Sequence, residues 1–305
     1  MRARTTIGQM RRTLAIMSGV SLATLLAACG TGGSAAEEGS GARVVKVAIV
    51  PTMPYIGVQN GKLIGLDGEL FNKAADKLGL QVQPLTVNFT GLMAGVQAHR
   101  YDIGIGDIFW KAERAQEGIF TDPPFYSPVV LAERQGLKVT TVDGLKGKQL
   151  GTGQGFVYVP ALQKVPGAKV HTYPTYQDTL QDLNADRIDI AFLDPLTVSY
   201  SRQRDPKSTY DVVPLTPPDA AQLAAQPQYS AFLPLMTGWY LNKAESALEG
   251  KLSKIIREFY ASGEAGQIVR KYGGDPETML KPYREFNAQR RATDRPADWK
   301  APSIP

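Results

Sequence analysis

Hydrophobic and polar positions along the chain predict short buried strands separated by amphipathic helices. Residues 44–50 (VVKVAIV) are apolar except for Lys46, which predicts a buried strand. A helix is predicted from its N-cap, Asp67, to Gly79, which is a typical stop signal. Its apolar positions, at helical spacing, are Leu70, Phe71, Ala74, Ala75 and Leu78. The same spacing predicts an amphipathic helix over residues 244–260. Further strands are predicted at 82–87, 127–133, 169–173 and 235–242, a helix at 156–164 and a loop at 214–234.

Residues 89–107 and 176–194 align with each other without a gap. Each begins with an aromatic residue, continues through a helix-like segment, and ends in a short apolar strand closed by an aspartate. The identities are Ala98/Ala185, Arg100/Arg187, Asp102/Asp189, Ile103/Ile190 and Asp107/Asp194. In open α/β sheets, ligands bind at the carboxyl ends of strands. Two such units therefore predict two lobes that face a shared cleft.

The order of these elements predicts an α/β protein in which the chain crosses between two lobes twice. Residues 43–131 together with 238–283 form the expected first lobe, and residues 132–237 form the second. The polar, arginine-rich residues 284–305 predict an irregular C-terminal tail. Two crossings permit hinge closure around a ligand.

The N-terminus predicts a signal peptide over residues 1–28. A positive segment with four arginines precedes an apolar run that is short for a membrane span. The run ends in residues 26–30 (LAACG), which resemble the lipobox of bacterial lipoproteins, where the cysteine is lipidated. Cys29 is the single cysteine of the chain. Residues 29–42 then form a flexible Gly/Ser tether that spans about 20 Å. The alternatives are an ordinary secretory signal with an incidental cysteine, and, through Arg11-Arg12, a twin-arginine export signal.

Charge and composition exclude several classes of function. Removing residues 1–28 lowers the formal net charge from +5 to +1, which leaves no electrostatic footprint for nucleic acid. A single cysteine excludes an internal disulfide. His99 and His171 are far apart in sequence and lack the spacing of metal ligands, so we expect no metal and no cofactor.

Several motifs, in order, resemble the family-3 extracellular solute-binding proteins, the amino-acid receptors of ABC importers. Residues 61–67 (GKLIGLD) resemble the family's entry to its first long helix, and residues 101–105 (YDIGI) its following strand. Residues 112–114 (AER), which precede Thr121-Asp122-Pro123, resemble the family's arginine signature. Later landmarks are residues 145–148 (LKGK) and 271–273 (KYG). The resemblance covers residues 45–274 and implies a two-lobed periplasmic-binding-protein-like fold with two hinge crossings.

The resemblance also implies a set of ligand-binding residues. Arg114 matches the arginine that clamps a ligand carboxylate, and Asp194 the acid that binds the ligand ammonium. Phe89 and Tyr55 match aromatic positions around the ligand. Gly155-Phe156 lies where the family offers backbone N–H groups to the carboxylate. The alternatives are a surface charge for Arg114, a turn former for Asp194 and a core residue for Phe89.

The chain departs from the family pattern on the loop before Arg114. Relatives have small or hydroxylated residues there, whereas this chain has Asp107, Phe109, Trp110 and Lys111. Two acids and several aromatic rings suit a cationic group. Alternatively, Lys111 pairs with Asp107 and neutralises it.

The resemblance implies a non-catalytic, extracytoplasmic receptor that captures a small polar solute, either an amino acid or an amine. We expect a monomer that is anchored to the membrane through Cys29 and delivers its solute to an importer permease. One alternative is an enzyme on the same scaffold, similar to cyclohexadienyl dehydratases, with Asp107, Lys111, Glu113 and Asp194 as acid–base groups. Another is a ligand-binding sensor.

Overall fold

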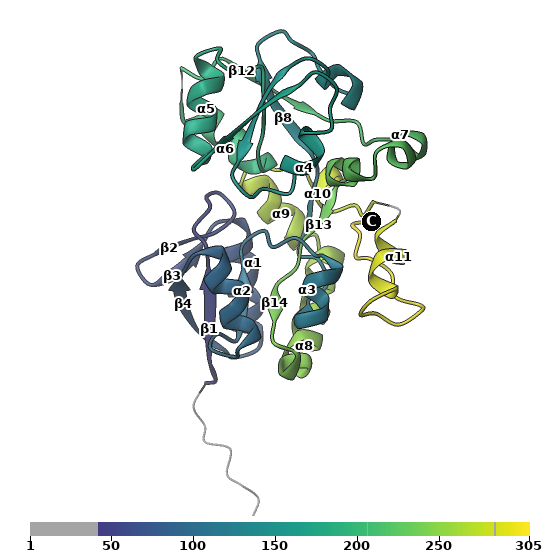
Figure 1. The fold of residues 1–305 in the computed structure, drawn as a ribbon. Helices are drawn as coiled ribbons and strands as arrows, with labels where there is room; N and C mark the ends of the chain where they lie inside the picture. The colour runs from purple at the N-terminus through teal and green to yellow at the C-terminus, as the bar shows by residue number, and fades with distance from the viewer. Residues whose placement is uncertain (1–41, 206, 284) are drawn as a thin grey trace, which may run out of the picture. The chain divides into compact units, whose positions relative to one another are not determined.

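The computed structural model describes residues 42–205, 207–283 and 285–305. The expected signal peptide, Cys29 and the tether up to residue 41 lie outside the described residues. Residues 42–305 form a unit of their own, many of whose elements are labelled in Figure 1. In the described ranges, no helix has both the length and the apolarity that crossing a membrane requires.

The first sheet combines strands from both ends of the unit. In spatial order its strands are β4 (Gln81–Thr86), β1 (Val44–Ile49), β5 (Ile103–Ile105), β14 (Tyr240–Leu241) and β6 (Ile119–Phe120). Strand β1 runs parallel to β4 and β5, whereas β14 is antiparallel to β5 and β6. The inner strands β5 and β14 are apolar and fully buried, as expected for a sheet covered on both faces.

Amphipathic helices bury their apolar sides around this sheet. These helices are α1 (Leu66–Lys77), α2 (Phe89–Gln97), α8 (Ser246–Ala261) and α9 (Glu264–Lys271), whereas the short α3 (Ala112–Glu117) has no fully buried residue. The apolar stripe predicted at 244–260 is confirmed, because its residues are buried along α8. Helix α9 packs on α1 and α8.

The second sheet is formed by the middle of the chain. In spatial order its strands are β10 (Lys169–Tyr173), β9 (Gln149–Gly153), β11 (Ile190–Phe192), β8 (Val130–Arg134) and β12 (Tyr210–Pro214). The first three are parallel, and β8 is antiparallel to both of its neighbours. The surrounding helices are α4 (Val159–Leu162), α5 (Tyr176–Asn184), α6 (Pro195–Arg204) and α7 (Ala220–Ala225). This sheet has hydrophobic clusters of its own.

The chain passes between the two sheets twice, which confirms the predicted crossings. On the two passages, β7 (Tyr126–Ser127) and β13 (Leu235–Met236) pair with each other. The strand predicted at 127–133 is therefore split between β7 and β8, because Pro128 has no N–H to continue the ladder. The strand predicted at 235–242 is likewise split between β13 and β14, which belong to different sheets.

The two aligned segments adopt equivalent structures. Each forms a helix followed by a strand, α2–β5 and α5–β11. The Asp102 carboxylate accepts a hydrogen bond from the N–H of Lys46 (2.7 Å), and that of Asp189 accepts one from Gln149 (2.8 Å). Both donors lie at or near the start of the neighbouring strand. The shared inner aspartates therefore have a structural role.

Two segments differ from the sequence prediction. Residues 214–234 contain α7 and a 3₁₀ helix (Pro227–Phe232) rather than loop alone. Asp219 and Gln222 form a capping box there, and Tyr229 and Phe232 are buried. The C-terminal tail is not irregular throughout, because α11 (Phe286–Arg291) follows the short α10 (Pro276–Met279). Tail residues such as Phe286 pack in the main core, which stabilises this helix.

Candidate ligand-binding site

Two aspartates lie at matching strand ends of the two sheets. Asp107 follows β5 and Asp194 follows β11, each at the carboxyl end of a strand with a parallel neighbour. Both side chains are partly buried. Burial, and after it the charges of Asp107 and Asp194, raises the pKa of the phenols of Tyr55 and Tyr158. The closing carboxylates of the two aligned segments are therefore close enough to influence each other and the same two phenols.

Burial makes both of these carboxylates costly to ionise. It raises the pKa of Asp194 to about 6. Burial, followed by repulsion from Asp194 and Asp67, raises the pKa of Asp107 well above its usual value. Among the described residues, no basic side chain contributes to either shift, and Oδ1 of Asp107 is buried without a hydrogen-bond partner. A bound cation would supply the missing stabilisation.

Asp67 supports the turn that carries Asp107. Its Oδ2 accepts hydrogen bonds from the N–H groups of Gly106 (2.9 Å) and Asp107 (3.1 Å), and its Oδ1 accepts one from the indole of Trp239 (2.5 Å). These bonds hold Asp107 at φ 53°, in the left-handed region. The prediction of Asp67 as an N-cap was wrong. Helix α1 begins after Gly65, and the Asp67 carboxylate bonds to distant segments instead.

Tyr55 joins the loop after β1 to the second sheet. Its ring is fully buried and stacks on Phe125, with 5.7 Å between centroids. Its hydroxyl accepts a hydrogen bond from the N–H of Leu196 in the first turn of α6 (3.2 Å). Gly65 allows the chain to approach this loop, because a Cβ there would lie 2.5 Å from the Tyr55 carbonyl oxygen.

The start of α6 combines the predicted Asp194 with one polar group, Thr197, that the sequence analysis did not identify. Asp194 is the N-cap of α6, but its side chain makes no capping hydrogen bond, so its carboxylate remains available for a ligand. Thr197, one turn on, has a buried hydroxyl without a hydrogen-bond partner among the described residues. An N-cap aspartate followed by Pro195 at N1 was a readable helix signal. No comparable local pattern in the sequence indicated that the Tyr158 phenol is buried near Asp194 and Asp107.

Arg114 projects from α3 and is held by two contacts. Its Nη1 donates to the carbonyl of Phe109 (2.7 Å), and its guanidinium lies over the ring of Phe89, 4.9 Å from the centroid. Phe89 is 41% exposed, so it is not the core residue considered as its alternative. Burial lowers the pKa of Arg114, and among the described residues no acid forms an ion pair with it within 4.0 Å. The remaining N–H groups of the Arg114 guanidinium are therefore not paired with a carboxylate of the described residues.

Lys111 lies near Arg114 rather than against Asp107. It is the N-cap of α3 and half-buried, and its pKa is lowered by burial and then by the charge of Arg114. Within the described part of the chain, no ion pair within 4.0 Å joins Lys111 to Asp107. The alternative in which these residues neutralise each other therefore does not describe this structure.

A cavity of about 380 Å³ opens beside Asp194. Its lining includes Pro51 and Thr52 of the first sheet's loop, and Phe156, Asp194 and Thr197 of the second sheet. Gly155, by contrast, is exposed and does not line it. The N–H of Phe156 donates to the carbonyl of Gly153 (3.2 Å), so this group is already used within the turn. The cavity lining includes Asp194 and Phe156 but not Arg114 or its neighbours Phe89, Phe109 and Lys111.

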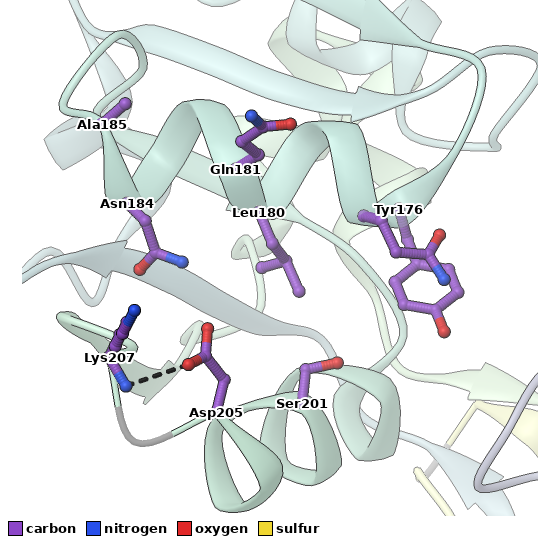
Figure 2. A pocket seen from close by; sticks show the side chains of 9 residues that line it. Tyr176, Leu180, Gln181, Asn184, Ala185, Ser201, Asp205 and Lys207 are labelled. Atoms are coloured by element: carbon purple, nitrogen blue, oxygen red, sulfur yellow. Dashed lines mark hydrogen bonds between the residues drawn. The ribbon is translucent and has the colours of Figure 1, made fainter.

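A second hollow lies between α5 and α6 and contains none of the predicted site residues (Figure 2). Tyr176, Leu180 and Asn184 line it on one side and Ser201 on the other. Near its edge, the Asp205 carboxylate accepts a hydrogen bond from the N–H of Lys207 (2.9 Å). All of its polar groups belong to the second sheet's outer helices and the following loop.

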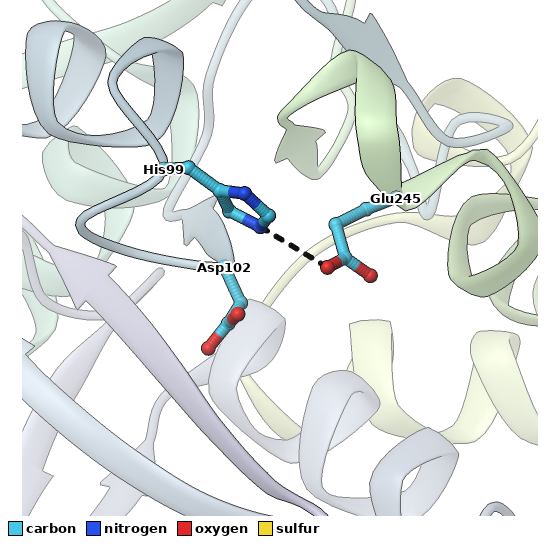
Figure 3. A group of neighbouring side chains, drawn as sticks. All are labelled: His99, Asp102 and Glu245. Carbon is cyan, nitrogen blue, oxygen red and sulfur yellow. Dashed lines mark hydrogen bonds and ion pairs between the residues drawn. The ribbon is translucent and has the colours of Figure 1, made fainter.

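His99, Asp102 and Glu245 form the one cluster of potential metal ligands among the described residues (Figure 3). His99 Nε2 lies 3.1 Å from a Glu245 oxygen, and Arg43 donates to the other Glu245 oxygen (2.8 Å). Asp102 already accepts the Lys46 N–H described above. Protein groups therefore satisfy these carboxylates, and we assign no metal to them.

Comparison with known proteins matches most of the chain to a single family. The sequence profile of "Bacterial extracellular solute-binding proteins, family 3" matches residues 45–275. A Bacillus subtilis protein described as "Probable amino-acid-binding protein YxeM" is 30% identical over 182 residues, 58% of this chain and 68% of its own. The arginine-binding extracellular protein ArtP of Bacillus subtilis is 21% identical over 267 residues, 86% of this chain and 98% of its own.

The fold likewise resembles solved structures. An ancestral arginine-binding protein bound to arginine superposes with a TM-score of 0.60 at 23% identity, covering 76% of this chain and 98% of its own. The likeness shows the two-lobed periplasmic-binding-protein-like fold that the sequence predicts.

Proposed function

We propose that this chain, which belongs to the family-3 bacterial extracellular solute-binding proteins, captures a cationic amino acid or related amine for an ABC importer. The observation that carries this proposal is the Asp107–Asp194 pair, one acid from each sheet, with no cationic protein partner among the described residues. An ammonium or guanidinium between these carboxylates would lower the cost of ionising both. The descriptions of relatives such as ArtP as arginine-binding support this ligand class.

Arg114 is the proposed partner of the ligand's carboxylate. Its guanidinium is oriented by the Phe109 carbonyl and the Phe89 ring, which leaves part of the fork for a bidentate contact. Phe109, Lys111 and the Gly155-Phe156 turn are proposed to shape the site around the ligand. Tyr55 supports a closed arrangement through its bond to Leu196. We propose that residues 43–131 with 238–283, and 132–237, act as two lobes that close about the crossings.

The matched relatives are binding proteins, so we propose receptor function rather than catalysis. Ligand capture and lobe closure do not require a covalent bond to be broken. The receptor would act outside the cytoplasm as a monomer and deliver its ligand to a permease. The dehydratase alternative requires turnover of an acid substrate, and a ligand that is recovered unchanged after binding would contradict that alternative.

Lipidation of Cys29 is proposed as the membrane anchor. Cells expressing the full chain should yield a membrane-bound form that incorporates labelled palmitate. A Cys29→Ala variant should incorporate none and leave the membrane fraction, because the chain then lacks its acyl attachment site. Equal labelling of the two forms would contradict the assignment.

An Arg114→Ala variant tests the proposed ligand geometry. Protein that lacks residues 1–28 should bind L-arginine or L-lysine in a calorimetric panel that also contains agmatine and cadaverine, their decarboxylated forms. Loss of Arg114 should weaken binding of the amino acids by about 2–5 kcal/mol, because the ligand carboxylate loses its partner in a desolvated site. Binding of the two amines should change little, because they carry no carboxylate.

The control for this variant is Arg100→Ala, which removes an exposed guanidinium from the turn between α2 and β5. It should leave all affinities unchanged. Equal losses for amino acids and amines in Arg114→Ala would remove Arg114 from carboxylate binding. A wild-type protein that binds no member of the panel would overturn the proposed ligand class.

A further inference from the structure

The C-terminal residues 285–305 lie beyond the part of the chain that matches the family, yet they are joined to the first sheet by a buried cation. Arg290 of α11 is 0% exposed. Its Nη1 and Nη2 donate to the carbonyls of Thr121 (3.1 Å) and Phe120 (3.2 Å), at the end of β6. Its Nε donates to Asp294 (3.0 Å). This guanidinium therefore satisfies backbone carbonyls at the point where the chain leaves the first sheet.

Arg290 also contacts two tryptophans from different parts of the chain. Its guanidinium lies 5.6 Å from the ring of Trp110 and 5.4 Å from the ring of Trp299. Burial is the main reason that its pKa is lowered, to about 10. Contacts with aromatic faces and paired carbonyls offset the cost of burying the charge.

Trp110 connects Arg290 to the ligand site. It lies between Phe109, whose carbonyl anchors Arg114, and Lys111, which caps α3. The backbone N–H of Trp110 donates to the carbonyl of Met236 in β13 (2.8 Å), and Phe109 forms an antiparallel β-bridge with Thr237. The segment that orients Arg114 is therefore held on one side by a crossing strand and on the other by Arg290.

The same tail contacts the other crossing strand. The ring of Phe286 stacks on Tyr126 of β7 at 5.4 Å, and the Tyr126 hydroxyl donates to the carbonyl of Pro302 (2.6 Å). The indole of Trp299 donates to Asp122 (2.9 Å), between β6 and β7. Both crossing segments are thus linked to residues 286–302.

We propose that Arg290 is a positioning residue for the ligand site, through which the C-terminal segment 285–305 sets the orientation of Arg114. This inference rests on the proposed function, because it assumes that Arg114 binds a ligand carboxylate. Arg290 itself touches no ligand; it acts through Trp110 and the Phe109 carbonyl. The tail is accordingly an integral part of the binding unit.

The test compares Arg290→Met with Lys281→Met, which removes a surface cation whose pairing with Glu277 is local. Arg290→Met should weaken binding of L-arginine about tenfold, and binding of agmatine less than about threefold. The selective loss follows because only L-arginine uses Arg114. Lys281→Met should change neither affinity. Equal losses for both ligands, or none, would overturn the proposal.

Hydrogen–deuterium exchange provides a readout that needs no ligand. Amide exchange in residues 109–117 should be faster in Arg290→Met than in the wild type or Lys281→Met, and unchanged rates would also refute the proposal. If Arg290→Met does not fold, Asp294→Asn loosens the same guanidinium more gently and should show both effects to a smaller extent. Absence of any binding by the wild type, with faster exchange in the variant, would instead refute the proposed ligand class.

Discussion

An Asp194→Asn variant is expected to lose affinity for cationic ligands while its ligand-free form becomes more stable. The amide is nearly isosteric but carries no charge, so an ammonium or guanidinium loses its counter-ion in a desolvated site. We expect at least about a hundredfold weaker binding. The stability gain arises because the pKa of Asp194, raised from 3.8 to about 6 by burial, makes its ionised form unfavourable in the folded protein. That shift corresponds to at most about 3 kcal/mol at neutral pH.

The pH dependence of both quantities follows from the same shift. Well below pH 3.8 the Asp194 carboxyl is protonated in the folded and the unfolded protein alike. Between about pH 4 and 6 the folded protein retains a proton that the unfolded chain has lost, so this group's contribution to stability declines as pH rises through that window. Ligand affinity should change in the opposite direction and weaken as pH falls below about 6. Asp194→Asn should flatten both profiles.

Calorimetry and thermal unfolding from pH 4 to 8 would measure these effects. The matched control is Asp186→Asn, which removes an exposed carboxylate from the same sheet at a left-handed position that asparagine tolerates. It should change neither affinity nor its pH dependence. Asp107→Asn, also at a left-handed position, should weaken binding as Asp194→Asn does if both acids face the cation. A ligand-free Asp194→Asn protein less stable than wild type would contradict our account of the buried charge.

An Asp67→Ala variant is expected to lose about 3–5 kcal/mol of unfolding free energy. Three donors would lose their acceptor: the partly buried N–H groups of Gly106 and Asp107 and the buried indole of Trp239. Each unsatisfied donor costs about 1–3 kcal/mol. Removing the buried charge relieves part of this cost, since burial raises the pKa of Asp67 to about 6. The lost hydrogen bonds nevertheless dominate, because there are three of them.

Chemical denaturation would measure this loss against Asp76→Ala, which removes an exposed carboxylate from the same helix. That control should change stability by less than about 0.5 kcal/mol. Asp67→Ala should also weaken ligand binding, because the Asp107 turn loses its support. Asp67→Asn should fall between the wild type and Asp67→Ala, since its amide retains one acceptor oxygen. An Asp67→Ala protein as stable as its control would show that water replaces the carboxylate.

Local patterns in the sequence predicted much of the fold but only part of the site. Helix α8 was readable from the apolar spacing of its one buried side, and strand β1 was readable from its nearly continuous apolar run. The aligned segments located Asp107 and Asp194 at equivalent strand ends. The role of Asp67 was not readable, because its partners lie about 40 and 172 residues away.

The C-terminal tail shows the same limit. Its many polar and charged residues suggested an irregular, solvated segment. Arg290 is instead fully buried, and its partners include the backbone carbonyls of residues 120 and 121. Contacts with backbone carbonyls cannot be predicted from the spacing of apolar and polar side chains. The strands predicted at 127–133 and 235–242 were each wrong as single strands, because the chain passes from one sheet to another within each of these segments.

The position of β14 has a consequence for how the chain folds as it is synthesised. This strand lies between β5 and β6, although it follows them by more than a hundred residues. A growing chain can complete the second sheet once residue 214 has emerged, while the first sheet still lacks an interior strand. Until residues 240–241 are added, the edges of β5 and β6 remain unpaired and open to other strands. The first sheet can therefore be completed only after the last third of the chain has been synthesised, and its two unpaired strand edges are exposed until then.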